Sequence, residues 1–195
     1  MTGLDPRVDE LVEIAVVITD FDLKPLAPGL DLVIQASQGA LDQMDDFVTK
    51  MHTHSGLIEQ IPQGLPLEEA QRRVMEYLRS HLPYAGTAQL AGNSVGQDKR
   101  FLDVYMPEVV GFLHYRIIDV STIKELAKRW YPRVYASAPE KNGGHRALAD
   151  ILESIRELAY YRKALFPAHL HPESGYYRQI AEQVSADFPI EDTAE

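Results

Sequence analysis

One stretch of the sequence places a potential proton acceptor close to a potential metal ligand. His145 follows Gly143 and Gly144, and Asp150 lies five residues later, within a periodic apolar run that predicts a helix over 146–166. Five residues of a continuous helix turn through about 500°, so the two side chains would not share one face. They can converge only if His145 lies outside the helix, which the two glycines permit. A loop histidine and a solvated helix aspartate are the simpler interpretation of this stretch alone.

A second carboxylate, Asp98, follows a predicted strand. The run 87–91 is typical of a short strand, and residues 92–98 then form a turn into a predicted helix at 99–105. Backbone N–H groups at a helix start favour anions, and loops after strands often carry functional residues. An aspartate that only complements the helix dipole is the competing interpretation.

Polar side chains in two other places could contact a ligand. His52 and His54 could suggest a metal, but the chain has no cysteine and no third ligand at helical spacing. A polar loop histidine or a substrate contact is therefore favoured over zinc. Ser121 and Thr122 stand where a predicted strand meets a predicted helix, so we expect a helix cap first and a phosphate contact second.

Arg116 is harder to explain in structural terms. It lies within the apolar run 114–120, which predicts a buried strand, and a buried guanidinium needs an anion as its partner. That partner would be an acidic side chain or the phosphate of a ligand. The sequence has no P-loop, no GxGxxG and no GxSxG, so it matches neither a nucleotide-binding fingerprint nor a nucleophile elbow.

Composition narrows the class of protein. The 195 residues are 45% apolar and 25% charged, which predicts one globular domain with a tail. A net charge of −10 argues against coating long nucleic acid, although a pocket for a short strand needs only a few local cations. Neither a membrane span nor a secretory signal is recognisable. Without cysteine, disulfides and thiolate chemistry are excluded, and a cytoplasmic location with no membrane partner is expected.

The order of the predicted elements indicates an α/β fold with a mixed sheet flanked by helices. Two β-branched apolar runs predict an antiparallel pair of strands, the first of them buried, and later segments alternate between strand and helix. The expected strands are 10–19, 30–36, 87–91 and 114–120, and the expected helices are 37–51, 66–82, 99–105, 121–130, 146–166 and 175–186.

Several motifs occur in a specific order. They are Met-Thr-Gly-Leu-Asp at 1–5, Leu-Val-Glu-Ile-Ala at 11–15, His-Thr-His-Ser-Gly-Leu at 52–57, Gly-Asn-Ser-Val-Gly-Gln-Asp at 92–98, a segment from His-Tyr-Arg to Lys-Glu-Leu over 114–126, and His-Arg-Ala-Leu-Ala-Asp at 145–150. On these motifs the chain resembles the oligoribonucleases, DEDDh-type 3′→5′ exoribonucleases that degrade very short RNA. The resemblance implies an RNase H-like exonuclease domain over 1–166 and a C-terminal tail over 167–195.

The activity of this family depends on four carboxylates and one histidine, and Asp98, Asp150 and His145 match three of these five groups. The resemblance implies two divalent cations, Mg²⁺ or Mn²⁺, held by the carboxylates, with His145 as general base for the attacking water. The other two carboxylates belong to an Asp-x-Glu strand that precedes the 1–5 motif in the family. We therefore expect the first strand and two metal ligands to be missing. The intact downstream positions favour a mis-assigned start or a truncated chain, and we expect this exact chain to be nearly inactive.

The resemblance also implies a cap that binds the 5′ phosphate of a short RNA. Its expected members are Ser94, Arg116, Ser121 and possibly Thr122. A phosphate at this place would give Arg116 its anion. The expected partners are therefore short oligoribonucleotides with a 5′ phosphate, and not long nucleic acid.

Four further residues are expected to contact the substrate. By resemblance, Leu4 and Phe47 would wedge or stack against the bases, and His52 would contact the substrate. Phe47 stands where the family often has tryptophan. Tyr115 would reach across the interface of a homodimer into the neighbouring site.

Two other functions stay open. A module that grips short RNA without cleaving it would explain the missing Asp-x-Glu. A DEDDh exonuclease acting on DNA is the other candidate, although the segments around Asp98 and over 114–126 resemble the oligoribonucleases more closely.

Overall fold

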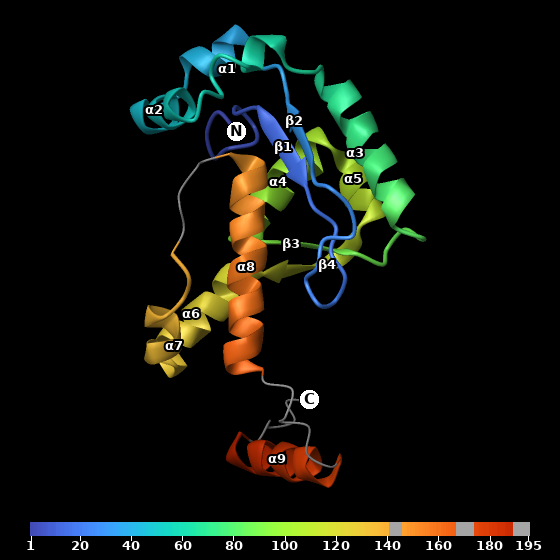
Figure 1. Ribbon diagram of the computed structural model, residues 1–195, viewed down its shortest axis with the longest axis vertical. Helices are drawn as coiled ribbons and strands as arrows, with labels where there is room; N and C mark the ends of the chain where they lie inside the picture. Colours follow the sequence, from blue (N-terminus) through green and yellow to red (C-terminus); the bar gives the residue numbers. More distant parts are fainter. Residues whose placement is uncertain (141–145, 167–173, 189–195) are drawn as a thin grey trace, which may run out of the picture. The chain divides into compact units, whose positions relative to one another are not determined.

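Strands β1 (Glu13–Val16) and β2 (Leu30–Val33) pair as an antiparallel two-stranded sheet (Figure 1). This pairing confirms the predicted antiparallel strands. On its other side, the β2 segment is bridged in parallel through Ile34 to Leu65. Gly64 makes this approach possible, because a Cβ at that position would lie 2.8 Å from the carbonyl carbon of Ile34.

Strands β3 (Gln89–Gly92) and β4 (His114–Asp119) form a second, parallel pair, with Gly92 opposite Asp119. Parallel strands place their carboxyl ends at one edge, and a helix follows each strand almost at once. The starts of these two helices therefore lie close together. Within the described residues, the two sheets are separate in their hydrogen bonding.

The computed structural model describes residues 1–140, 146–166 and 174–188. Its helices are α1 (Gln38–Asp42), α2 (Asp46–His54), α3 (Leu67–His81), α4 (Val95–Tyr105), α5 (Pro107–Phe112), α6 (Val120–Trp130), α7 (Pro132–Ala136), α8 (Ala147–Leu165) and α9 (Ser174–Asp187), with a 3₁₀ turn at Ile61–Gln63. Chain contacts define one unit of Met1–Tyr161 and another of Arg162–Glu195, a division that falls inside α8. None of the described helices could cross a membrane.

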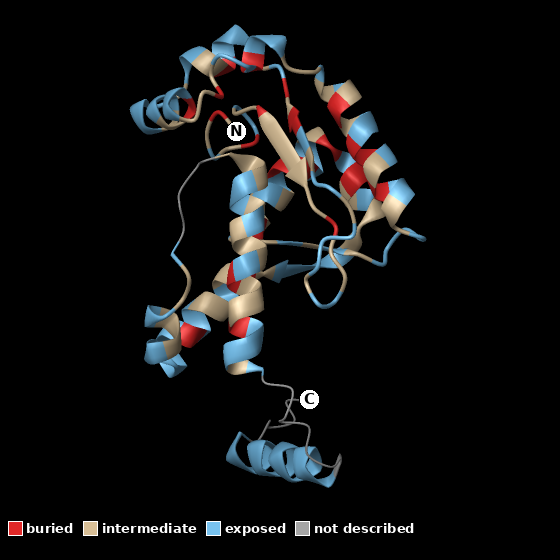
Figure 2. Ribbon diagram, in the orientation of Figure 1, coloured by how far each residue is buried: buried red, intermediate tan, exposed pale blue. Residues whose placement is uncertain are grey.

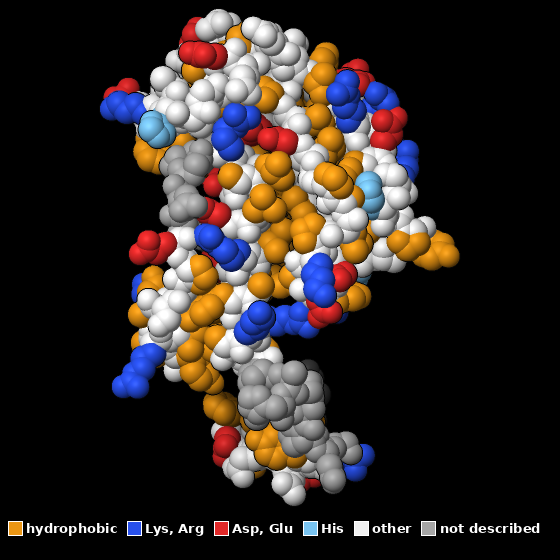
Figure 3. Space-filling model, viewed as in Figure 1, with side chains coloured by type: hydrophobic (Ala, Val, Ile, Leu, Met, Phe, Trp, Pro, Cys, Tyr) orange, Lys and Arg blue, Asp and Glu red, His pale blue; other side chains and the backbone are white. Residues whose placement is uncertain are grey.

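The main core collects apolar side chains from both sheets and from helices α3, α4 and α5. Val74 of α3 and Phe101 of α4 are fully buried in it, while Ile14 of β1 and Leu90 of β3 are partly buried against it. Helix α3 forms because its apolar residues recur at helical spacing. This spacing puts them on one face of the helix, and that face is buried (Figure 2). Its outer face carries charges of both signs, including the Glu69–Arg73 ion pair (Figure 3).

One prediction about a helix is wrong in detail. The single helix expected over 37–51 is two helices, because Asp45 breaks the run and caps α2 by accepting from the N–H of Val48 at 2.8 Å. The helices expected over 99–105 and 121–130 end as predicted, at Tyr105 and Trp130, and Pro107 and Pro132 then begin α5 and α7. Proline is well suited to the first turn, where an N–H has no helical partner.

Two predictions about strand burial are also wrong. All four residues of β1 are half-buried, and most of β4 is exposed, including Ile117 and Ile118. Both strands are edge strands within the described residues, so their apolar side chains lack the cover that a central strand receives.

Candidate active site

Asp150 lies in the first turn of α8, and the start of that helix is attached to strand β1. The Glu13 carboxylate accepts from Arg146 Nε at 2.6 Å and from the Ala147 N–H at 3.0 Å. The Glu13 side chain is only 6% exposed, so this ion pair is largely shielded from water. Glu13 therefore sets where helix α8 begins, and with it the position of the exposed Asp150.

Asp98 lies in the first turn of α4, close to the end of β3 as predicted, although the helix begins earlier, at Val95. Its neighbour Gln97 donates from Nε2 to the carbonyl of Leu4 at 2.6 Å, which ties the N-terminal segment to α4. Asp98 keeps solvent contact, yet desolvation by the surrounding protein raises the pKa of its carboxyl, and the nearby Asp119 adds to the rise. A cation would favour the charged form of this carboxyl.

The donor types suit a hard cation, but the described residues do not complete a site for one. Asp98 and Asp150 offer carboxylate oxygens, which Mg²⁺ and Mn²⁺ prefer. Across 1–140, 146–166 and 174–188, no three side chains of histidine, cysteine, aspartate or glutamate gather as a metal site. His145, the predicted general base, lies outside the described residues, so its role stays a prediction.

The turn between β3 and α4 closes onto the start of α6. The Ser94 N–H donates to Asp119 Oδ1 at 2.9 Å and to Ser121 Oγ at 3.0 Å, and the two serine hydroxyls lie 3.3 Å apart. Ser94 has a φ of 53°, a left-handed conformation that is uncommon for a residue with a Cβ and is often found at functional sites. The structure therefore brings together two residues of the predicted phosphate cap.

The helix cap of α6 differs from the prediction. Asp119, and not Ser121, is the capping residue, because its Oδ1 accepts from the Ser121 N–H at 2.9 Å. An aspartate is as good a cap as a serine, and here it also reaches the Ser94 N–H. The Ser121 hydroxyl therefore points to Ser94 and Asn93 instead. Thr122 lies exposed in the same first turn.

The prediction that Arg116 is a buried guanidinium is wrong. Arg116 is exposed on β4, and its guanidinium lies 5.4 Å from the ring centroid of Tyr115, which is itself 74% exposed. Arg116 has no carboxylate partner among the described residues. Its charge is therefore available to a ligand. Because Arg116 is exposed, it needs no anionic partner in order to lie on β4.

Comparisons with known proteins show the family of this chain. The exonuclease family RNase_T matches residues 1–158. The chain is 64% identical over 172 residues to the oligoribonuclease of Leifsonia xyli subsp. xyli, covering 88% of this chain and 83% of that protein. It is 49% identical to the oligoribonuclease of Streptomyces griseus (95% and 92% covered) and 50% identical to that of Rhodococcus jostii (94% and 93% covered). This chain belongs to the oligoribonuclease family.

The base-contact residues expected in an oligoribonuclease differ in exposure. Leu4 and Phe47 are about 70% exposed, as a wedge or a stacking platform requires. His52 is only 3% exposed, because it lies within α2 and its Nε2 is 2.9 Å from the Met1 carbonyl. His52 is therefore buried against the N-terminal residue, and its predicted contact with the substrate stays a prediction.

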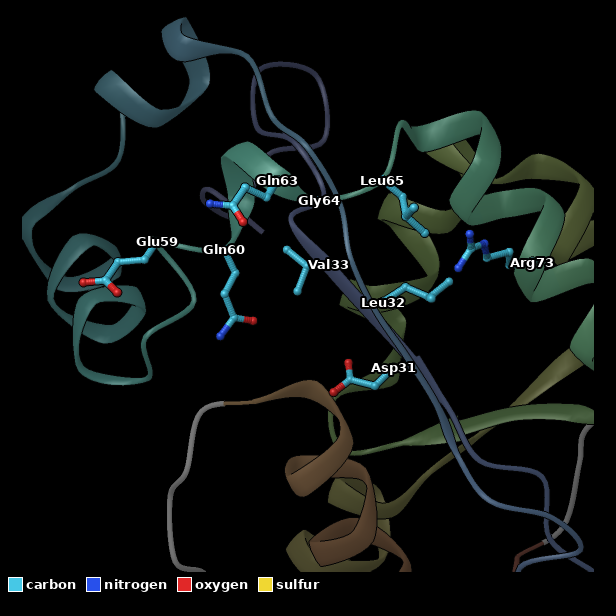
Figure 4. A pocket seen from close by; sticks show the side chains of 9 residues that line it. All are labelled: Asp31, Leu32, Val33, Glu59, Gln60, Gln63, Gly64, Leu65 and Arg73. Carbon is cyan, nitrogen blue, oxygen red and sulfur yellow. The ribbon is translucent and has the colours of Figure 1, made fainter.

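A hollow lies elsewhere on this oligoribonuclease-family chain, and it contains none of the predicted site residues. Figure 4 shows its polar lining from β2 and the segment before α3, including Asp31, Gln60 and Gln63, with Arg73 at one side. Burial raises the pKa of the Asp31 carboxyl, and nearby Glu13 adds to the rise. We assign it no role in catalysis.

Sequence reasoning missed Glu13, Asn93 and Glu157. Glu13 could have been found from the sequence, because it is a charged residue inside an apolar strand. A carboxylate buried there needs a partner, which is the argument that was applied to Arg116. Glu157 sits at the buried side of α8 among apolar positions and gave the same signal. Asn93 gave none, since its role depends on which side chains the fold places around it.

Proposed function

We propose that this chain binds short oligoribonucleotides and hydrolyses them from the 3′ end to mononucleotides. The observation that carries the proposal is the closure of the β3–α4 turn onto α6, which joins Ser94 to Ser121 beside the solvent-exposed Thr122. The Ser94 N–H and the Ser121 proton are used within the turn, so the groups that suit the 5′ phosphate of a short strand are the Ser94 and Thr122 hydroxyls and the exposed Arg116. The relatives are named oligoribonucleases, and we extend that activity, a cytoplasmic location and an exonuclease domain over 1–166 to this chain.

In this proposal Asp98 and Asp150 hold divalent cations, Mg²⁺ or Mn²⁺, and His145 takes the proton of the attacking water. When bound, the cations lower the pKa of that water and stabilise charge on the leaving 3′ oxygen. The anchor between Glu13 and the start of α8 supports the role of Asp150, because it restricts where that carboxylate can move.

Substrate length is set, in this proposal, by the cap at the 5′ end. Arg116 adds a positive charge near Ser94 and Ser121, and Thr122 adds a hydroxyl. A phosphate on the cap and a scissile bond at the cations leave room for only a short strand. Leu4 and Phe47 wedge or stack against the bases; His52 contacts the Met1 carbonyl, and Gln97 donates to the Leu4 carbonyl.

The proposal includes a homodimer in which Tyr115 reaches the neighbouring site. What supports it is the exposure of Tyr115 on β4, next to the exposed Ile117 and Ile118. Apolar side chains on an exposed strand favour coverage by another chain.

The test compares this chain with its Asp98→Asn version. Both are given a 5′-phosphorylated diribonucleotide and Mn²⁺, and nucleotide release is measured. We expect the wild type to release mononucleotides and Asp98→Asn to be at least about tenfold slower, because an amide replaces a carboxylate that would hold a cation. Equal rates would contradict the proposed role of Asp98.

Two further readings of the same assay separate the alternatives. Tight binding by both versions without cleavage by either would favour a short-RNA-binding module. Equal cleavage of the corresponding DNA dinucleotide would favour a DNA-directed exonuclease.

A further inference from the structure

Glu157 is a buried carboxylate that no step of the proposed mechanism uses. It lies on α8 and is 4% exposed. Its Oε1 is 3.3 Å from Lys124 Nζ of α6, and its Oε2 accepts from Asn93 Nδ2 at 3.1 Å. A charge buried to this extent is retained only with such partners, so the two contacts explain why it can lie there. They also place it directly behind the Ser94–Ser121 cluster.

The Glu157 carboxylate determines the orientation of the Asn93 side chain. An ionised carboxylate only accepts hydrogen bonds, so Asn93 must present its NH₂ group to it. The same NH₂ group donates to Ser154 Oγ at 2.8 Å. The remaining atom, Asn93 Oδ1, therefore accepts from the Ser121 hydroxyl at 3.2 Å.

This orientation also determines what the Ser121 hydroxyl can do. Its single proton is directed to Asn93, so its oxygen is left to accept from the Ser94 N–H at 3.0 Å. Ser94 is then held in its left-handed conformation by Ser121 and Asp119 together. The direction of the hydrogen bond between Ser121 and Asn93 follows from the buried carboxylate, whereas the Ser94 N–H can only donate.

The same set of contacts reaches the helix that carries Asp150. Ser154, which accepts from Asn93, donates from its hydroxyl to the carbonyl of Asp150 at 2.8 Å. Asn93 is thus bonded both to the cluster that would bind the phosphate and to the first turns of α8. A shift of Asn93 would change the spacing between these two places.

We propose that Glu157 is a positioning residue that, through Asn93, holds the phosphate cap at a set spacing from Asp150 and thereby creates the preference for short 5′-phosphorylated RNA. The proposal rests on the proposed function, in which the 5′ phosphate binds at this cluster. Because the Ser94 N–H and the Ser121 proton are already used, the Ser94 hydroxyl is the donor that the cluster offers to it. Glu157 itself touches no substrate. Its effect is on which substrates bind.

Glu157→Gln tests this with almost no change in volume. Lys124 is a donor only, so it would draw the amide oxygen of the new side chain and turn the new NH₂ group toward Asn93. Asn93 would then have to flip, and its own NH₂ group would face the Ser121 hydroxyl. The substitution would therefore reverse the hydrogen bond between Asn93 and Ser121, and the Asn93 NH₂ group would compete with the Ser94 N–H for the Ser121 oxygen. Glu125→Gln is the matched control, because Glu125 is on α6 beside Lys124 but is 54% exposed and, among the described residues, pairs with Arg129.

The measurement is binding of a diribonucleotide with and without a 5′ phosphate, in EDTA so that nothing is cleaved. We expect the affinity ratio of the two ligands to fall at least about tenfold in Glu157→Gln and to stay unchanged in Glu125→Gln. An unchanged ratio in Glu157→Gln would overturn the proposal.

A second measurement separates this inference from the proposed function. Amide hydrogen exchange at Ser94 is followed in the ligand-free protein, and we expect it to be faster in Glu157→Gln than in the wild type and the control. If the wild type showed no phosphate preference, the proposed function would fail. The exchange rate would still show whether Glu157 holds Ser94, and unchanged exchange would overturn that claim. If Glu157→Gln does not fold, Asn93→Ala removes the same NH₂ group without adding a charge and must give the same two results.

Discussion

Glu13 and Arg146 lie 133 residues apart in the sequence and form a 2.6 Å ion pair in the structure. The same carboxylate caps the first helical N–H of α8, at Ala147. One side chain of an edge strand therefore fixes the start of the helix on which Asp150 lies. The negative Glu13 carboxylate is attracted by two positive groups at once, the N-terminus of α8 and the Arg146 guanidinium.

Glu13→Gln should destabilise the protein by about 2 kcal/mol, because it leaves Arg146 facing a neutral partner in a largely dry place. The Arg146 side chain is 27% exposed, so water compensates for part of the loss. Urea unfolding measures the change. Glu125→Gln, which breaks the exposed pair with Arg129, should cost less than about 1 kcal/mol. Equal costs for the two substitutions would show that the Glu13 pair is no stronger than a surface pair.

Arg116→Ala should weaken binding of a 5′-phosphorylated diribonucleotide by about 10- to 100-fold, the effect of losing a charged hydrogen bond. Binding of the unphosphorylated dinucleotide should change little, because Arg116 is exposed and supports no other described side chain by an ion pair. Arg129→Ala serves as the control for loss of a surface charge. Isothermal titration in EDTA measures the six affinities, those of the two ligands for the wild type, Arg116→Ala and Arg129→Ala. If both ligands lost affinity equally, Arg116 would not be part of a phosphate cap.

Tyr161→Phe should stabilise the protein. The Tyr161 hydroxyl is buried and has no hydrogen-bond partner among the described residues, so its removal relieves a desolvation cost of about 1 kcal/mol. We expect the Tm to rise by about 2–4 °C in calorimetry. Tyr160→Phe is the matched control with the opposite sign, because the Tyr160 hydroxyl donates to the Val134 carbonyl at 2.8 Å. A lower Tm for Tyr161→Phe would contradict the missing partner.

The same tyrosine predicts a loss of stability in alkali. Burial raises the pKa of Tyr161 to about 12, with the nearby Glu157 as the next cause, from an ordinary value of 10.0. The unfolded chain therefore loses this proton at lower pH than the folded one. Stability is complete below pH 10 and should fall as the pH rises from 10 to 12. Tyr161→Phe should show a shallower fall in urea unfolding over this range, and parallel curves would contradict the shift.

Burial of His52 predicts that stability falls as the pH drops, whereas burial of Tyr161 predicts a fall as the pH rises. Burial lowers the pKa of its imidazole below the ordinary 6.5, so the unfolded chain binds the proton first as the pH falls. The stability contributed by neutral His52 is present above pH 6.5 and is lost as the pH drops below that value. We expect the stability difference between the wild type and His52→Gln to be larger at pH 8 than at pH 5. A difference that stayed constant with pH would mean that His52 titrates normally.

The sequence by itself determined the elements whose periodicity is strong. Helices α3 and α8 follow from apolar positions at helical spacing, and β1, β2 and β3 from short apolar runs with turn residues at their ends. Asp98 near the start of α4 also follows from local order alone. These features depend on neighbours within a few residues, which the sequence displays directly.

Only the tertiary structure decided the burial and the partners of the polar side chains. Arg116 reads as buried from its apolar neighbours, yet it is exposed because no described strand covers β4. Ser121 reads as a helix cap, yet Asp119 takes that place and Ser121 bonds Asn93 and Ser94 across the fold. Hydrogen bonds between distant segments depend on which strands pair and where the helices cross. Local sequence patterns do not contain this tertiary arrangement.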